Sequence, residues 1–91
     1  MRVQPMTGVR VDLCRDGSLE LRLDTADRPL SYRCSPVRTA MWIALRQHDG
    51  DPGAAARTLA LQWGTAPAAT RADLDRWVAE LREAGLAHAV P

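Results

Sequence analysis

The sequence predicts an α+β fold in which a three-stranded antiparallel meander is followed by three α-helices. Two observations lead to this fold class. Apolar residues alternate with polar ones through the first third of the chain, and from residue 35 onward they recur with the 3.6-residue period of a helix. Strands at one end of a chain and helices at the other are typical of α+β domains. Because 91 residues suffice for one core, we expect a single domain over 1–91.

The alternating segments predict strands at about 8–14, 18–24 and 29–34. Apolar residues take every second position in the first two: Val9, Val11, Leu13, Leu19, Leu21 and Leu23. Between them, Asp16-Gly17 predicts a tight hairpin turn with positive φ at both central positions. A polar turn over 24–28 leads to the third strand. Pro29 has no N–H to donate to a ladder, so we expect the third strand at a sheet edge.

Helices are predicted at about 36–48, 52–63 and 68–84. Ser35-Pro36 and Asp51-Pro52 each combine an N-cap residue with a proline at the first helical position. In the third helix, Thr70 and Asp73 resemble a capping box. The apolar stripe that follows has helical spacing and comprises Leu74, Trp77, Val78 and Leu81. We expect Leu74 and Leu81 in the core, and Trp77 partly exposed beside a groove.

Composition argues against several classes of function. The net charge of +1 is too small for the basic footprint of a nucleic-acid-binding domain. Cys14, Cys34, His48 and His88 form no pattern typical of a catalytic or zinc site, so we expect no enzyme activity, no catalytic residues, no metal and no cofactor. With no signal peptide in residues 1–7 and no apolar run of about 20 residues, we expect a cytoplasmic protein without a membrane partner.

Two binding functions remain open. A winged-helix DNA-binding or transcription-regulatory protein would insert the third helix into the major groove. That helix carries three Arg and four acidic residues, so it is poorly suited to a phosphate backbone. Peptide capture is favoured instead, because an edge strand at 29–34 can accept an extended peptide as a further strand.

The order and spacing of several short motifs resemble the PqqD-like domains, also called RiPP recognition elements. The resemblance covers about 8–90. The residues that carry it are Gly8-Val9-Arg10-Val11, Ser35-Pro36-Val37, Met41-Trp42, Trp63-Gly64 and the pattern formed by Asp73, Leu74, Trp77, Val78, Leu81, Gly85 and Leu86. The sequence departs from the family at Arg33 and Cys34, where apolar or aromatic residues are more usual, and in the turn before the third strand.

This resemblance implies a winged helix-turn-helix fold that binds the leader segment of a ribosomally made precursor peptide. The peptide would lie along the third strand, in a groove against the third helix, and would be presented to a separate leader peptidase or other modifying enzyme, as in lasso-peptide biosynthesis. No nucleic-acid partner is implied. Carried onto this chain, the peptide-binding residues are Leu30, Ser31, Tyr32, Arg33, Cys34, Arg71, Leu74, Trp77, Val78, Leu81 and Arg82.

Overall fold

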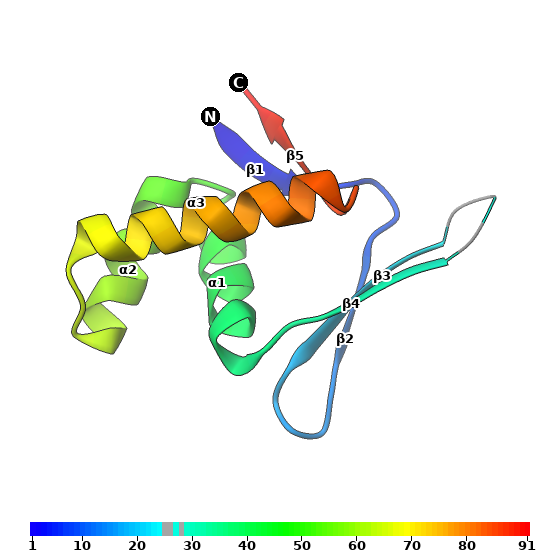
Figure 1. The fold of residues 1–91 in the computed structure, drawn as a ribbon, viewed down its shortest axis with the longest axis horizontal. Coiled ribbons are helices and arrows are strands. Elements are labelled where there is room, and N and C mark those ends of the chain that lie inside the picture. The colour runs from blue at the N-terminus through cyan, green and yellow to red at the C-terminus, as the bar shows by residue number, and fades with distance from the viewer. Residues whose placement is uncertain (25–26, 28) are drawn as a thin grey trace.

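The computed structural model describes residues 1–24, 27 and 29–91 and has an α+β architecture (Figure 1). Its elements, in chain order, are β1 (Arg2–Pro5), β2 (Arg10–Leu13), β3 (Leu19–Asp24), β4 (Pro29–Arg33), α1 (Pro36–Gln47), α2 (Pro52–Trp63), α3 (Pro67–Glu83) and β5 (Ala87–Val90). The predicted α+β class, with an antiparallel sheet and three helices, is therefore confirmed. The polar turn expected over 24–28 falls largely outside the described residues.

Strands β2, β3 and β4 form an antiparallel sheet in that order, which places β4 at an edge. The hairpin between β2 and β3 differs from the expected two-residue turn. Gly17 has a φ of 87°, but Asp16 does not share a positive φ, and the Gly17 N–H donates to the Cys14 carbonyl at 3.0 Å. The loop therefore has three residues, with glycine taking the left-handed position after a turn, and the Asp16 carboxylate accepts from the Ser18 N–H.

The first two helices begin as their capping residues predict. The Ser35 side chain accepts from the Arg38 N–H at the start of α1. At the start of α2, the Asp51 side chain accepts from the N–H groups of Gly53 and Ala54. The capping box expected in α3 is wrong. Thr70 lies inside the helix, which begins at Pro67, and its buried hydroxyl donates to the Ala66 carbonyl at 3.2 Å.

A second sheet, of β1 and β5, was not predicted and joins the two ends of the described chain (Figure 1). Gly85, at a φ of 80°, reverses the chain after α3, and the Leu86 N–H donates to the Leu81 carbonyl. The chain then continues into β5. On the other edge of this sheet, the Val3 N–H donates to the Gly50 carbonyl at 2.8 Å. The β1–β5 sheet is thereby fastened to the turn after α1.

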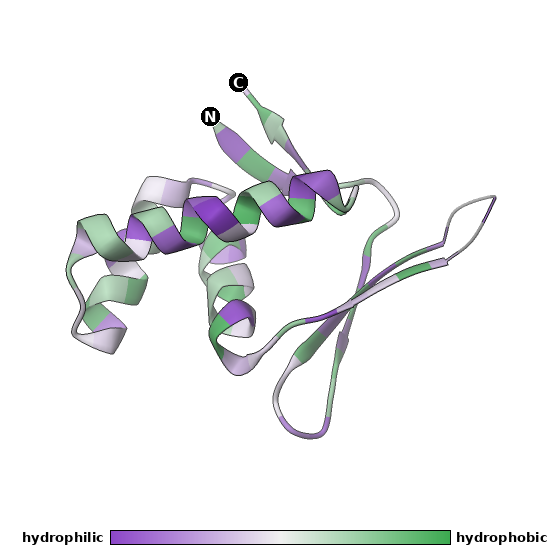
Figure 2. Cartoon of the chain, viewed as in Figure 1, coloured by the Kyte–Doolittle hydropathy of each residue, from purple (hydrophilic) through white to green (hydrophobic). Residues whose placement is uncertain are grey.

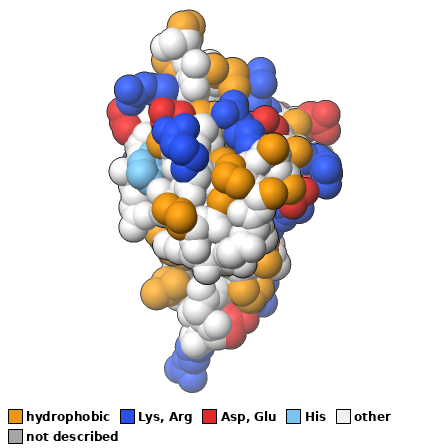
Figure 3. Space-filling model, turned by 90° about the vertical axis from the view of Figure 1, so that its left-hand side faces the viewer, with side chains coloured by type: hydrophobic (Ala, Val, Ile, Leu, Met, Phe, Trp, Pro, Cys, Tyr) orange, Lys and Arg blue, Asp and Glu red, His pale blue; other side chains and the backbone are white. Residues whose placement is uncertain are grey.

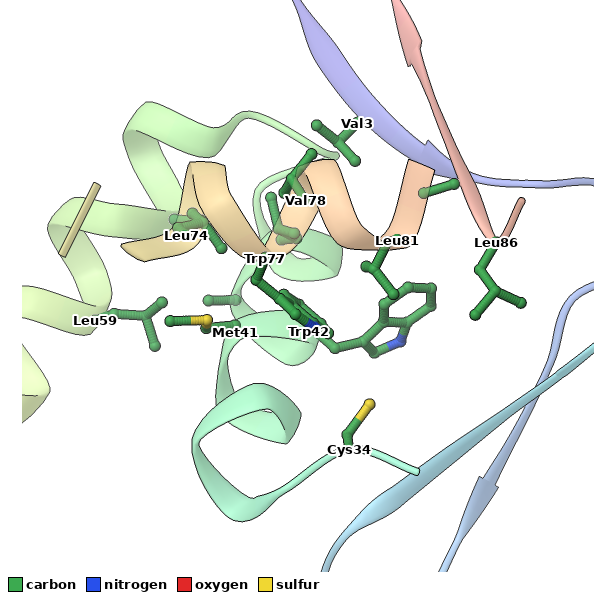
Figure 4. Close-up of a cluster of buried hydrophobic side chains, with 14 of the residues drawn as sticks. Val3, Cys34, Met41, Trp42, Leu59, Leu74, Trp77, Val78, Leu81 and Leu86 are labelled. Carbon is green, nitrogen blue, oxygen red and sulfur yellow. The ribbon is translucent and has the colours of Figure 1, made fainter. Parts of the chain in front are cut away.

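The core lies between the three helices and one face of β3 (Figure 4). Trp77 of α3 and Trp42 of α1 both point into this space. Leu21 of β3 is fully buried. The sheet extends away from the helices, so its far side is poorly covered (Figure 1). In β2, Val11 remains 44% exposed and Leu13 74% exposed.

Hydrophobic and hydrophilic residues are interspersed along the strands and along α3 (Figure 2). Across residues 1–24, 27 and 29–91, none of the helices has the length and apolar character needed to cross a bilayer.

Candidate functional site

The outer edge of β4 presents backbone groups that do not bond to β3. The Cys34 N–H donates to the Leu19 carbonyl at 2.8 Å, which makes residues 34 and 19 a hydrogen-bonded pair. Such pairs alternate along an antiparallel ladder. With Leu21 opposite Tyr32 and Leu23 opposite Leu30, the backbone groups of Leu30 and Tyr32 point toward β3. The N–H and C=O groups of Ser31 and Arg33 consequently point away from the sheet.

A hydrogen bond connects this edge strand to α3. The Trp77 indole N–H donates to the Tyr32 hydroxyl at 3.1 Å, with Trp77 fully buried and Tyr32 half-buried. The guanidinium of Arg38, from the first turn of α1, lies 5.9 Å from the centre of the Trp77 ring, in cation–π range. We call these three residues, Tyr32, Arg38 and Trp77, the edge cluster. It links β4 to α3 and to the first turn of α1.

Burial and hydrogen bonds hold the connection from β4 to α1 in place. Cys34 is 1% exposed, and burial raises the pKa of its thiol to about 11, so the thiol is neutral at physiological pH. Ser35 caps α1 immediately afterwards. One turn later, the buried Thr39 hydroxyl accepts from the Leu19 N–H at 3.1 Å, which bonds α1 directly to β3.

The outward face of the edge carries a positive charge. Arg33 is exposed and its side chain extends toward the β2–β3 hairpin. There the Cys14 side chain, first by hydrogen bonding and then by charge, raises the pKa of Arg33, and the Asp16 carboxylate adds to this effect. Asp16 itself has a lowered pKa, principally because its carboxylate accepts from the Ser18 hydroxyl and N–H.

The sequence-predicted site residues fall into three groups in the structure. Leu30, Ser31, Tyr32 and Arg33 lie together on β4, with Cys34 buried directly after it. The apolar residues of α3 are all buried, with exposed fractions of 4% or less: Leu74, Trp77, Val78 and Leu81. The expected partial exposure of Trp77 is therefore wrong, because Tyr32, Arg38 and the core surround its ring. These four side chains belong to the core and offer no open wall beside β4.

Arg71 and Arg82 are exposed and lie near opposite ends of α3. Arg71 forms an ion pair with Asp75 at 2.9 Å and reaches toward Gly53 at the start of α2. Arg82 borders a shallow depression beside β5, together with His88. The structure thus places each arginine beside a neighbour other than β4.

Two residues that matter for the site were not among the sequence-predicted ones. Arg38 contacts the Trp77 ring, and Thr39 fastens α1 to β3. Both lie in the first turn after the Ser35 cap, and a helix that starts directly at the end of an edge strand must bring its first turn close to that strand. The direct connection of strand to helix is therefore the sequence feature that could have identified both residues.

Metal-ligating side chains are not clustered in the described part of the structure. No group of three or more His, Cys, Asp or Glu side chains could hold a metal ion there. A ring nitrogen of His48 hydrogen bonds to the Thr58 hydroxyl at 2.7 Å, which links the end of α1 to α2. His88 lies beside the Met6 sulfur. Each histidine thus has a local packing role.

Comparisons with protein-family models, with curated proteins and with solved structures found no match to this chain.

Proposed function

We propose that this chain is a leader-peptide-binding domain of the winged helix-turn-helix type. It captures the leader segment of a ribosomally made precursor as an added strand on β4 and presents it to a separate leader peptidase or other modifying enzyme. The observation that carries this proposal is the outward direction of the Ser31 and Arg33 backbone groups on an edge strand. The motif resemblance to RiPP recognition elements supports the same function.

Strand addition at this edge follows from the hydrogen-bonding groups it offers. Ser31 and Arg33 each present one N–H donor and one C=O acceptor, so an extended peptide gains up to four main-chain hydrogen bonds. Pro29 would also face outward in this alternation but has no N–H. The donors are therefore concentrated toward the end of β4 that adjoins α1.

The structure changes which side chains we expect the peptide to meet. Because the apolar stripe of α3 is buried, peptide side chains that point toward α3 would contact the edge cluster, in particular the half-buried Tyr32 and Arg38. Among the described residues, no Asp or Glu side chain forms an ion pair with Arg38. A carboxylate on the peptide would provide one.

DNA binding through α3 is less well supported. Two of its arginines form ion pairs within the helix, Arg71 with Asp75 and Arg76 with Asp73. The end of the molecule that carries α2 and the start of α3 shows basic and acidic side chains interspersed (Figure 3). Phosphate contacts need cations that are free to bind the backbone. Fluorescence anisotropy against a random duplex should therefore show weak binding, and sub-micromolar affinity with a steep salt dependence would favour the DNA alternative.

Peptide capture is testable without knowing the precursor. Random twelve-residue peptides selected on the immobilised chain provide a probe, and amide shifts of the labelled protein then locate the peptide. We expect the largest shifts at Ser31 and Arg33. Ser31→Pro deletes an outward donor and obstructs the added strand, so it should weaken binding at least about tenfold. Ser31→Ala keeps the N–H and serves as the matched control, with unchanged affinity.

Two results would contradict the proposal. One is amide shifts that cluster around Asp16-Gly17 and leave β4 unaffected. The other is full binding by Ser31→Pro. The presenting role has its own test, in which labelled precursor is incubated with this chain, with the peptidase, and with both. Cleavage is expected to need the peptidase and to be stimulated by this chain, and cleavage by this chain alone would refute a non-catalytic role.

A further inference from the structure

The opposite edge of the same sheet, β2, has an unusual combination of features. All four of its residues are exposed, and the core-facing positions hold large apolar side chains, Val11 at 44% and Leu13 at 74% exposure. Edge strands usually avoid such a surface, because an apolar side chain beside free backbone groups invites another strand. Within the described part of the chain, β2 pairs only with β3.

The free backbone groups of β2 belong to those same apolar residues. The Cys14 N–H donates to the Ser18 carbonyl at 2.8 Å, so residues 14 and 18 form a hydrogen-bonded pair. Alternation along the ladder then directs the backbone of Asp12 toward Glu20 and that of Arg10 toward Arg22. Val11 and Leu13 direct their N–H and C=O groups away from the sheet.

The strand is also complementary to itself. In an antiparallel pair of two β2 strands centred on Val11, the residue numbers of each facing pair add up to 22. Val11 then faces its own copy, Leu13 faces Val9, and Arg10 faces Asp12. One face of the pair is apolar and the other carries two opposite-charge pairs. The Val9 N–H is already bonded to the Met6 carbonyl, so Val11 and Leu13 supply the donors in each copy.

The charges of the isolated sheet favour this arrangement. Within one chain, Arg10 lies directly opposite Arg22, and Asp12 directly opposite Glu20. Like charges in facing positions are destabilising. Within one chain this repulsion is offset by ion pairs of Arg10 with Asp24 at 2.8 Å, and of Arg22 with Glu20 at 3.4 Å and with Asp12 at 3.6 Å. A second copy gives both Arg10 and Asp12 a facing partner of opposite charge.

We infer that β2 is a homodimerisation edge, where two copies of this chain pair their β2 strands antiparallel about Val11 into a six-stranded sheet. The β4 edge is less suited to self-pairing, since its outward residues are Pro29, Ser31 and Arg33, which include no carboxylate. An interface of one short strand is well below the roughly 800 Å² per partner of a standard complex. The dimer should therefore be weak, with a dissociation constant on the order of 0.1 mM.

Sedimentation velocity of the full chain from about 10 µM to 1 mM tests this inference. We expect a concentration-dependent shift from monomer to dimer. In the dimer, residue 10 of each copy faces residue 12 of the other. Arg10→Asp and Asp12→Arg each place like charges in both of these facing pairs, so either change should raise the dissociation constant at least about tenfold. The double variant, R10D with D12R, restores opposite charges and should recover dimerisation.

Leu13→Ser and Leu61→Ser form a matched pair. Both shorten a highly exposed leucine, at 74% and 86% exposure, but only the first lies on β2. The first should weaken the dimer and the second should leave it unchanged. The inference is overturned by a monomer at 1 mM, by a dimer insensitive to both single charge changes, or by a double variant that fails to recover. Circular dichroism of each variant establishes that it is folded.

Discussion

Replacing Tyr32 with Phe tests how β4 is held against α3. The change removes one oxygen, which accepts the Trp77 indole N–H at 3.1 Å. Trp77 is 0% exposed, so water has no access to replace the lost acceptor. A buried donor left without a partner costs about 1–3 kcal/mol. For a domain of this size, each kcal/mol lowers the melting temperature by about 4–8 °C.

Urea denaturation followed by tryptophan fluorescence measures the loss, and a double-mutant cycle assigns it. Trp77→Phe also removes the donor, so Tyr32→Phe should cost far less in that background than in the native chain. An equal cost in both backgrounds would show that the loss does not come from the hydrogen bond to the Trp77 indole. A loss below about 0.5 kcal/mol would mean that the hydrogen bond does not stabilise the fold.

Three further predictions concern turns, caps and pH. Gly50→Ala should cost about 2–5 kcal/mol, because Gly50 has a φ of 82° and an added methyl group would collide with the Val3 carbonyl. In the control Gly17→Ala, φ is 87° but the space is open, so about 1–2 kcal/mol is expected from denaturant unfolding. Ser35→Ala should cost about 1 kcal/mol by loss of its cap, whereas Ala66→Ser, at an N-cap without a side-chain bond, should gain up to about 1 kcal/mol in the same assay. Burial raises the pKa of Cys34 from 9.0 to about 11, so the unfolded chain loses this proton first. The stability that the Cys34 thiol contributes should therefore be fully present below pH 9 and be lost between pH 9 and about pH 11, and Cys34→Ala should abolish this component of the pH profile.

Alternation of apolar and polar residues identified β2, β3 and β4 because side chains in a strand alternate between the two faces of a sheet. It could not tell which strand the helices would cover. Val11 in β2 and Leu21 in β3 follow the same pattern and face each other, yet one is 44% exposed and the other fully buried. That difference arises from where α1 and α3 pack, which a local pattern does not encode.

The β1–β5 sheet was missed for a related reason. Each strand has four residues, one contains Pro5, and their partners are separated by most of the chain, as in the pairing of Arg2 with Val90. Neither segment has a period that distinguishes it from a terminal coil. Helix starts were more predictable, because Ser35 and Asp51 act through residues within three positions.

The candidate edge was predictable as an edge but not in its details. Pro29 predicts that its strand lies at an edge, because proline has no N–H to donate to the hydrogen bonds of a central strand. Whether Ser31 or Tyr32 faces outward depends on the register with β3, and the register depends on the turn that joins the strands. The hydrogen bond from Trp77 to Tyr32 likewise joins residues 45 positions apart, which no local pattern predicts.

Strand order determines whether the two proposed interactions can coexist. A dimer paired through β2 has the order β4-β3-β2-β2-β3-β4, in which both β4 strands remain terminal. Five intervals of about 4.8 Å separate them by about 24 Å, too far for two single added strands to meet. Peptide affinity should therefore not change as the chain dimerises with increasing concentration. If copies instead paired through β4, dimer and peptide would compete for Ser31 and Arg33, and the apparent affinity for peptide would fall as protein concentration rises. Titration of one selected peptide at 10 µM and at 1 mM protein thus distinguishes the two edges.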